Sequence, residues 1–374
     1  MKFLILNTDY PEFLRLLYSQ HPGLERQSYE HQMRVRHESL FGLADFYSTN
    51  LRKLGYEAWD IHANNRFLQT AWAKEHGLKV ASDWQWQFRL RRGIVPWVSR
   101  IYKPRWFNDI LAAQIRHCKP DVLLNQKMDG VNNDFLREIK PYVKLLVGQH
   151  AANRLPETKN WSVYDLVISS FPPTLDWFRL KGIAAELNRL GFEPRVLSHL
   201  KDGEKRIPIS FVGSFYDAVH NTRIEWLEYL SSRLEVKVWS PHTKNLPAAS
   251  PILRSYVGPA WGTEMYQVLR DSLLTLNHHG NIPPYANNLR LYEATGVGTL
   301  LLTDWKPNLY EIFEPGKEVI AYRTAEECAE LIKYYLEHEN ERREIARAGQ
   351  QRTLRDHTYY NRLRELVDIV QKYL

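Results

Sequence analysis

The feature that most constrains the fold is a series of short apolar runs that end in polar residues and alternate with segments of helical periodicity. Residues 3–6 form the first run, which ends in Asn7, and residues 120–125 and 143–147 repeat the arrangement. Short apolar strands that alternate with amphipathic helices are typical of a parallel sheet with helices on both faces. We therefore predict an α/β fold whose polar loops gather at the carboxyl ends of the strands.

The chain is predicted to form two domains of this kind. Residues 191–205 are charged, contain glycine and lack apolar periodicity, which is typical of a linker. We expect Rossmann-like parallel-sheet domains over residues 1–200 and 207–355, with a central cleft between two facing sheets. The length of 374 residues agrees with two domains.

Helices are predicted to dominate the last part of the chain. Thr324 and Glu327 form a capping box, which predicts a helix through residue 336. Residues 338–374 are expected to continue as helix, with interruptions at Gly349 and at residues 357–358.

The composition narrows the classes of protein and of partner. Lys and Arg outnumber Asp and Glu by 50 to 43, and this basic excess suits a phosphate-bearing or anionic partner. The two cysteines, Cys118 and Cys328, indicate neither a disulfide scaffold nor a thiolate metal site. No run is long enough for a membrane-spanning helix, and the first residues lack the features of a signal peptide. We expect a cytoplasmic protein, with contact at the inner face of the membrane left open.

The most informative motif spans residues 287–304. Its Gly296-Val-Gly298 element follows a helix and precedes a strand, which is the reverse of a dinucleotide-binding fingerprint. Gly296 is expected to cap the helix, and Gly298 to permit tight packing between helix and strand. Glu293 is expected in the last turn of that helix, where the helix dipole disfavours a negative charge. We interpret Glu293 as an acceptor of hydrogen bonds from hydroxyls such as those of a ribose.

The second half of the chain resembles the donor-binding domain of group 1 glycosyltransferases, most closely the spore-maturation CgeB-like branch. The resemblance rests on Arg-Leu-Tyr-Glu-Ala ending at residue 294, Gly-Val-Gly-Thr at 296–299, the Thr-Asp end of the next strand, and His-Thr-Tyr at 357–359. It is strong over residues 207–374 and general before them. It implies the GT-B fold, a nucleotide-sugar in the cleft, no obligatory metal, and a C-terminal helix over residues 356–374 that crosses back to the first domain.

The resemblance also assigns donor-binding residues. Glu293 matches the second carboxylate of the family's E-x7-E element, which holds the donor ribose, whereas Tyr285 stands where the first carboxylate is expected. Gly213 and Ser214 follow a strand and precede a helix, a geometry in which backbone N–H groups approach a diphosphate. Arg223 is the phosphate candidate, and Arg290 is either a second one or part of a surface salt bridge. The expected donor-binding residues are Glu293, Gly213, Ser214, Arg223, Asn277, His278, Tyr285, Asn287, Asn288 and Arg290.

Two residues of the first half are candidates for catalysis. His150 follows the strand at 143–147, and family members commonly have a histidine there near the transferred sugar; a plain loop histidine is the alternative. Asp9 is the candidate base for the acceptor hydroxyl if the reaction inverts. The chain contains no Asp-x-Asp, and the adjacent His278 and His279 would point to opposite sides of a strand. We expect no metal and no cofactor, since the nucleotide-sugar is a substrate.

Aromatic and basic residues interleave between positions 84 and 107 without a single acidic residue. Such a composition suits a lipid headgroup boundary, an anionic acceptor or single-stranded nucleic acid. An insertion that packs on its own domain is the alternative. The candidate residues for contact with an acceptor or a membrane are Trp84, Trp86, Arg89, Arg91, Arg92 and Trp97.

Together these features predict a glycosyltransferase that moves a sugar from a nucleotide-sugar to a hydroxyl of a glycan, lipid-linked, protein or small-molecule acceptor. Two alternatives remain: a nucleotide-sugar epimerase of the same fold, and a basic protein that binds nucleic acid or a membrane surface. Nucleic acid is the least expected partner, because no recognised binding module accompanies the basic segment.

Overall fold

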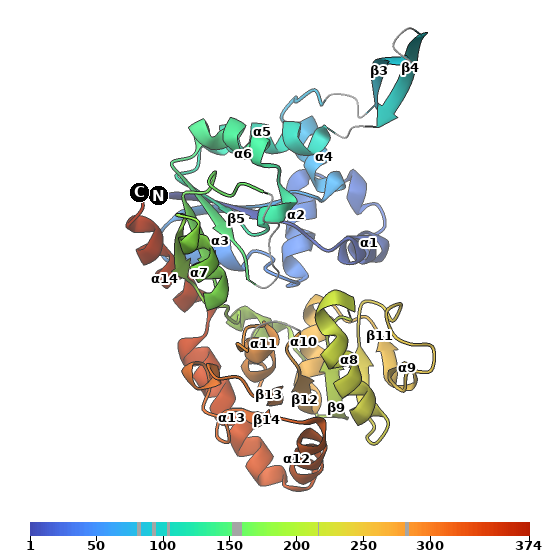
Figure 1. Ribbon diagram of the computed structural model, residues 1–374. Helices are drawn as coiled ribbons and strands as arrows, with labels where there is room; N and C mark the ends of the chain where they lie inside the picture. Colours follow the sequence, from blue (N-terminus) through green and yellow to red (C-terminus); the bar gives the residue numbers. More distant parts are fainter. Residues whose placement is uncertain (81–83, 92–94, 103–104, 152–158, 216, 281–283) are drawn as a thin grey trace.

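The computed structural model describes residues 1–374 except 81–83, 92–94, 103–104, 152–158, 216 and 281–283. Residues 84–91, 95–102 and 217–219 are described by their backbone alone. Two α/β lobes lie one beside the other along the long direction of the molecule (Figure 1). The predicted fold class is confirmed, since each lobe is built on a six-stranded parallel sheet.

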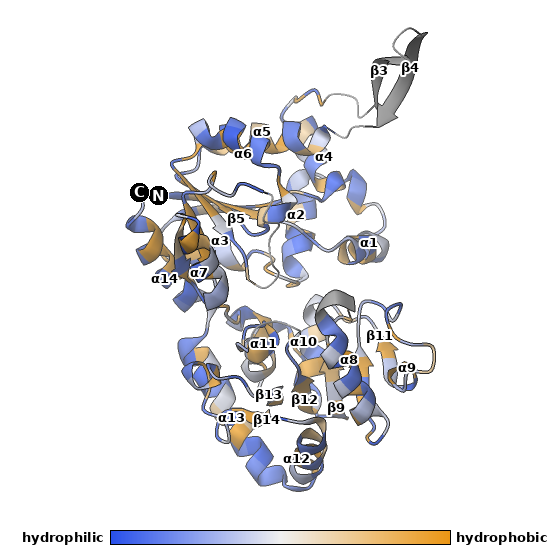
Figure 2. Cartoon of the chain, viewed as in Figure 1, coloured by the Kyte–Doolittle hydropathy of each residue, from blue (hydrophilic) through white to orange (hydrophobic). Residues whose placement is uncertain are grey.

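The N-terminal sheet has the strand order β2-β1-β5-β6-β7-β8. Its strands are β1 (Lys2–Asn7), β2 (Glu57–His62), β5 (Val122–Asn125), β6 (Leu145–Gln149), β7 (Leu166–Ser169) and β8 (Ala184–Leu187). The helices around it are α1 (Pro11–Gln20), α2 (Tyr29–Glu38), α3 (Phe46–Lys53), α4 (Arg66–Glu75), α5 (Trp106–Cys118), α6 (Asn133–Ile139) and α7 (Pro172–Leu180). Apolar residues concentrate in the strands between the helices (Figure 2), as expected of strands that are covered on both faces.

The C-terminal sheet has the order β11-β10-β9-β12-β13-β14, so the direction of strand addition reverses between β9 and β12. Its strands are β9 (Ile207–Val212), β10 (Lys237–Trp239), β11 (Tyr256–Gly258), β12 (Ser272–Asn277), β13 (Leu300–Asp304) and β14 (Ile320–Tyr322). Its helices are α8 (Asp217–Ser231), α9 (Ile252–Ser255), α10 (Gly262–Arg270), α11 (Arg290–Gly296), α12 (Ala325–Glu337) and α13 (Glu339–Asp356).

The chain crosses between the lobes twice. After β8 it passes through the 3-10 turn η4 (Pro194–His199) into β9, and after α13 it returns as α14 (Tyr359–Gln371), which packs against α3 of the N-terminal lobe. The two crossings are joined, because the N–H of Phe192 donates to the carbonyl of His357 at 2.8 Å and the N–H of Tyr359 donates to the carbonyl of Phe192 at 2.9 Å. The lobes therefore share one continuous apolar core at this point.

Two features differ from the sequence-based expectations. The segment 191–205 is only partly a linker, since it includes η4 and the fully buried Phe192. Gly349 does not interrupt the helical tail but lies inside α13. Glycine is needed there because a Cβ would overlap the carbonyl of Glu318.

A two-stranded antiparallel hairpin, β3 (Trp84–Arg91) and β4 (Val95–Tyr102), pairs with itself in a sheet of its own. Its register places Trp84 opposite Tyr102. The hairpin projects from the N-terminal lobe on the side of α4 and α5, away from the C-terminal lobe (Figure 1).

Candidate functional site

Loops that follow the carboxyl ends of strands in both lobes contact each other. The side-chain amide of Asn287, beyond β12, donates to the carbonyl of Ala151, beyond β6, at 2.7 Å. The ring of Tyr285 meets the ring of Phe171, beyond β7, edge to face at 6.0 Å. The predicted donor-binding loop of the C-terminal lobe therefore lies against the N-terminal lobe beside His150.

Glu293 and Arg290 form a buried pair at the start of α11. Arg290 Nη1 lies 2.8 Å from Glu293 Oε2, and Arg290 Nε and Nη2 donate to the carbonyl of Val212 at 3.2 and 3.0 Å. Burial raises the pKa of Glu293, and Arg290 and the hydroxyl of Tyr266 only partly offset this. Arg290 is thus not part of a surface salt bridge but joins Glu293 to the end of β9.

The position of Glu293 differs from the expectation. It stands in the first turn of α11, which begins at Arg290, and not in the last turn. A carboxylate in the first turn of a helix is favoured by the dipole, so the dipole argument for Glu293 was wrong. Gly296, at the end of the helix, is instead needed for packing, since a Cβ there would lie 2.5 Å from the ring of Phe192.

Arg223 of α8 joins the end of β9 to the end of β12. Its Nε donates to the carbonyl of His278 at 2.9 Å and its Nη1 donates to the carbonyl of Ser214 at 3.0 Å. Burial lowers the pKa of Arg223 to about 10, so the side chain stays cationic at neutral pH. A buried cation fixed at the carboxyl ends of β9 and β12, between which the strand order reverses, is suited to bind a phosphate group.

The remaining predicted donor residues have partners within the protein. Asn288 donates from Nδ2 to Asn277 Oδ1 at 2.8 Å, and Asn277 donates from Nδ2 to the hydroxyl of Thr303 at 2.9 Å. This chain of amides fixes the loop before α11 to the ends of β12 and β13. The N–H of Gly213 donates to the carbonyl of Trp239 at 3.0 Å and is not free for a diphosphate.

His278 belongs to a stack of rings beside Arg223. Its ring lies 5.0 Å from that of Trp226, which in turn stacks on Tyr322 at 5.4 Å. Burial lowers the pKa of His278 to about 4, so the ring is neutral at physiological pH. A pocket of about 360 Å³ opens beside this stack, between α8 and the start of α12.

His279 and Asp304 form a second buried pair that sequence reasoning missed. Asp304 Oδ1 accepts from the N–H of His279 at 3.0 Å and lies 2.6 Å from its Nδ1, while Lys306 Nζ lies 2.9 Å from Oδ2. Burial alone would raise the pKa of Asp304, but His279, His278 and Lys306 together outweigh it and the pKa falls well below its usual range. The pair ties β12 to β13. The sequence indicated this pair only through the Thr303-Asp304 end of β13.

Asp9 does not have the surroundings of a catalytic base. Arg36 Nη2 lies 2.6 Å from Asp9 Oδ1, His62 Nδ1 lies 3.0 Å from Oδ2, and the carboxylate is 3% exposed. Burial would raise the pKa of Asp9, but Arg36 and His62 together hold it far below its usual range. Since both oxygens are occupied and the group is a weak base, we correct the role of Asp9 to a structural anchor of α2.

His150 remains a candidate. It is half-buried, its N–H donates to the carbonyl of Ile168 at 3.2 Å, and it precedes Ala151, which accepts from Asn287. Of the acceptor or membrane candidates, Arg92 lies outside the described residues. The others are placed in β3 and β4 by their backbone alone: Trp84, Trp86, Arg89, Arg91 and Trp97.

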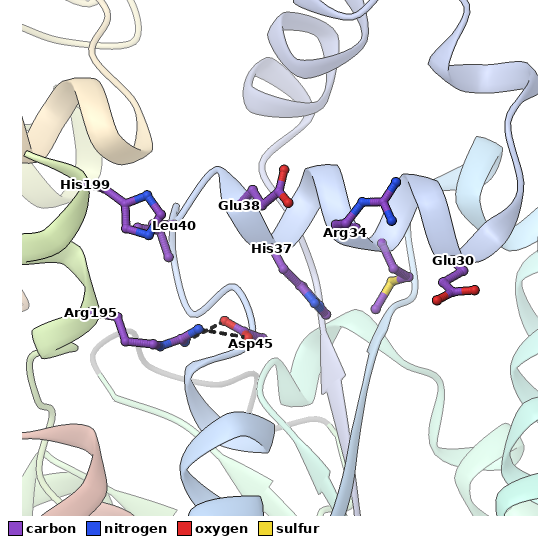
Figure 3. A pocket seen from close by; sticks show the side chains of 9 residues that line it. Glu30, Arg34, His37, Glu38, Leu40, Asp45, Arg195 and His199 are labelled. Atoms are coloured by element: carbon purple, nitrogen blue, oxygen red, sulfur yellow. Dashed lines mark hydrogen bonds and ion pairs between the residues drawn. The ribbon is translucent and has the colours of Figure 1, made fainter.

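A second pocket, of about 380 Å³, lies between α2 and η4 (Figure 3). Arg195 of η4 reaches across to Asp45 with hydrogen bonds of 2.7 and 3.2 Å. None of the predicted donor residues lines it; its lining residues are Glu30, Met33, Arg34, His37, Glu38, Leu40, Asp45, Arg195 and His199.

Within the described part of the chain, no three His, Cys, Asp or Glu side chains are grouped so that they could hold a metal ion. A search of the same residues for helices long and apolar enough to cross a membrane found none.

The comparisons with known proteins found similarity to a glycosyl transferase-like family and to solved structures of glycosyltransferases. Residues 196–368 match the model of a family described as glycosyl transferase-like. The Anabaena protein HepE in complex with UDP-glucose is 12% identical, with a TM-score of 0.58 and all of both chains covered. A glycosyltransferase from Rickettsia africae is 11% identical, with a TM-score of 0.58 over 100% of this chain and 98% of the other. The pneumococcal O-GlcNAc transferase GtfA, bound to UDP and GlcNAc, is 10% identical, with a TM-score of 0.56 over 100% and 99%. No curated protein sequence matches the chain.

Proposed function

We propose that this protein is a nucleotide-sugar-dependent glycosyltransferase, since the chain has the GT-B fold and residues 196–368 match a glycosyl transferase-like family model. The observation that carries the proposal is the convergence of Glu293, Arg290 and Arg223 on the ends of β9 and β12. Ligands of open α/β sheets bind where the strand order reverses, and here it reverses between these two strands.

The donor is proposed to be a nucleoside diphosphate sugar. In this proposal the carboxylate of Glu293 accepts hydrogen bonds from the ribose hydroxyls, and Arg223 faces the diphosphate. Two of the structural neighbours were solved with UDP-glucose or with UDP and GlcNAc, which makes UDP the first nucleotide to test.

The reaction breaks the bond between the sugar and the diphosphate and forms a bond from the same carbon to the acceptor oxygen, and the proton of that oxygen passes to the departing diphosphate. Arg223 stabilises the negative charge that develops on the departing diphosphate, because a buried cation acts strongly in a medium of low dielectric constant. His150 is proposed to lie near the transferred sugar, on the acceptor side. No step of the proposal runs through a metal ion.

A thermal-shift screen tests the donor. UDP, GDP and ADP and their sugars are compared on the wild-type protein, on Glu293→Gln and on the exposed control Glu330→Gln. The correct nucleotide at about 100 times its Kd stabilises the folded state by about 2.7 kcal/mol. This stabilisation should fall in Glu293→Gln, which loses the charged acceptor for the ribose hydroxyls, and persist in the control. If none of these ligands raises the melting temperature of the wild type, the proposal is wrong.

We also propose that the chain belongs to the CgeB-like branch.

The β3–β4 hairpin is proposed to contact the acceptor. The hairpin projects from the N-terminal lobe on the side away from the C-terminal lobe and the donor residues, where it can meet a distant part of a large acceptor (Figure 1). Its sequence is basic and aromatic without an acidic residue. Replacing residues 81–104 with a short Gly-Ser linker should leave nucleotide binding intact and abolish transfer. Retained transfer in that variant would remove the hairpin from the acceptor site. Co-sedimentation with anionic vesicles, with and without the hairpin, tests whether this segment also contacts a membrane surface.

A further inference from the structure

The helix α10 begins at the interface between the lobes. The N–H of Thr263 in its first turn donates to the carbonyl of Ser39, in the loop after α2, at 3.2 Å. Gly262 has a φ of +54°, and a Cβ at this position would overlap the same carbonyl. The first turn of a helix leaves N–H groups without intrahelical partners, and one of them is satisfied here by the other lobe.

Trp261, the residue before α10, is partly buried and contacts three aromatic rings of the N-terminal lobe. Its ring meets that of Phe41 edge to face at 4.7 Å and lies 6.1 Å from the rings of both Tyr10 and Phe13. Tyr10 and Phe13 belong to the start of α1, directly after β1, and Phe41 belongs to the loop after α2. We call these three residues the aromatic socket. Edge-to-face and tilted arrangements at such distances are favourable for aromatic pairs.

The socket is held in place by the buried ion pair of Asp9. Arg36, bound to Asp9, also donates from Nη2 to the carbonyl of Phe41 at 3.1 Å and from Nη1 to the hydroxyl of Ser39 at 3.2 Å. Its guanidinium lies 4.8 Å from the centre of the Phe13 ring. The socket is therefore fixed by side chains of the N-terminal lobe.

On the other side, α10 leads from Trp261 to the proposed donor ligands. Met265, one turn further along, accepts from Arg290 Nη2 at its sulfur, at 3.6 Å. The next residue, Tyr266, is fully buried, and its hydroxyl faces Glu293 closely enough to lower the pKa of that carboxyl in part. One short helix thus touches the aromatic socket at its start and both members of the Arg290–Glu293 pair one turn later.

We propose that Trp261 is a positioning residue, which sets the place of α10, and through Met265 and Tyr266 that of Arg290 and Glu293, by docking into the aromatic socket. The inference rests on the proposed function, since it concerns the same nucleotide site. It assigns to the N-terminal lobe a part in nucleotide affinity that needs no contact with the nucleotide.

Titration calorimetry with UDP tests the inference on Trp261→Ala, Trp261→Phe and the control Trp177→Ala, in which a half-buried tryptophan of α7 is removed away from the interface. We expect the Kd to rise about tenfold in Trp261→Ala, to recover in Trp261→Phe and to stay unchanged in the control. In Glu293→Gln the added Trp261→Ala should have little further effect, because both changes act on one unit.

Three results are decisive. Wild-type affinity in Trp261→Ala, or losses that simply add in the double variant, would overturn the inference and leave the proposed function intact. A wild-type protein that binds no nucleotide would overturn the proposed function instead. Small-angle scattering without ligand tests the docking independently: a larger radius of gyration in folded Trp261→Ala supports the socket, and an unchanged one counts against it.

Discussion

Asn287 donates its side-chain amide to the carbonyl of Ala151 at 2.7 Å, and so joins the loop before α11 to the loop after β6. The two residues belong to different lobes and are 136 positions apart in the chain. The bond lies beside His150, where the proposed donor and acceptor sides meet.

Asn287→Ala removes this bond and should lower the free energy of unfolding by about 1 kcal/mol. Asn287→Asp should cost more, because a carboxylate then faces the carbonyl of Ala151. Urea denaturation at pH 7 measures both, with the exposed Asn340→Ala as the control. Equal stability of all three variants would mean that the bond between the lobes contributes nothing.

Asp9→Asn should be strongly destabilising, by about 3–5 kcal/mol, because it leaves the buried Arg36 without its counter-charge. The low pKa of Asp9 adds stability above pH of about 4, and this contribution is lost as the pH falls further. Urea denaturation at pH 7 and pH 3 should therefore show a smaller difference at pH 3. The exposed Asp134→Asn is the control. A stable Asp9→Asn protein without transferase activity would restore Asp9 as the base.

His357 should make the protein sensitive to acid. Burial and the neighbouring Arg362, whose Nη2 lies 2.6 Å from His357 Nδ1, lower the pKa of His357 to about 4. The neutral ring contributes its full stability above pH of about 6.5, and up to about 3 kcal/mol is lost as the pH falls to about 4. His357→Gln should flatten this part of the stability profile in urea titrations from pH 8 to pH 4. The exposed His338→Gln should retain the wild-type slope.

Gly296→Ala should destabilise the joint between the lobes by about 1–3 kcal/mol, because the added methyl meets the ring of Phe192. Phe192→Leu makes room, so the double variant should be more stable than the sum of the two single losses predicts. Chemical denaturation of the four proteins checks this. Gly203→Ala, which has open space, is the control. Strict additivity would show that the contact is not tight.

Arg223→Lys should weaken UDP binding about tenfold and leave uridine binding unchanged. Lysine keeps the charge but cannot reproduce the two bonds that fix the guanidinium against Ser214 and His278. Calorimetry with UDP and with uridine compares the losses, with the exposed Arg233→Lys as the control. An equal loss for both ligands would place Arg223 away from the diphosphate.

The strands and the two-sheet architecture were predictable, because a strand covered on both faces must be apolar along its whole length. The start of α11 at Arg290 was not predictable. The residues before Arg290 could equally form another turn of helix, and the loop is fixed instead by the hydrogen bond from Asn288 to Asn277. The sequence suggested a helix break at Gly349. Glycine is required there because of the nearby carbonyl of Glu318, which belongs to a segment distant in the sequence.

For the site, the sequence singled out Glu293, Arg290 and Arg223 as donor-binding candidates but did not indicate the residues that they contact in the fold. The role of Asp9 could not be predicted, because Arg36 and His62 lie 27 and 53 positions away and neither belongs to a recognisable motif. Burial decides whether a carboxylate next to a strand is a base or an anchor, and burial here depends on how α2 packs.

The return of α14 to the N-terminal lobe affects how the protein is made. Phe46 and Tyr47 of α3 pack against Tyr359 of α14, with ring centres 5.4 and 5.6 Å apart, although roughly 300 residues separate them in the chain. During synthesis the N-terminal lobe emerges from the ribosome first but lacks the helix that covers α3. That apolar face therefore stays uncovered until the C-terminal lobe has been translated, and the lobe made first is the last to be completed.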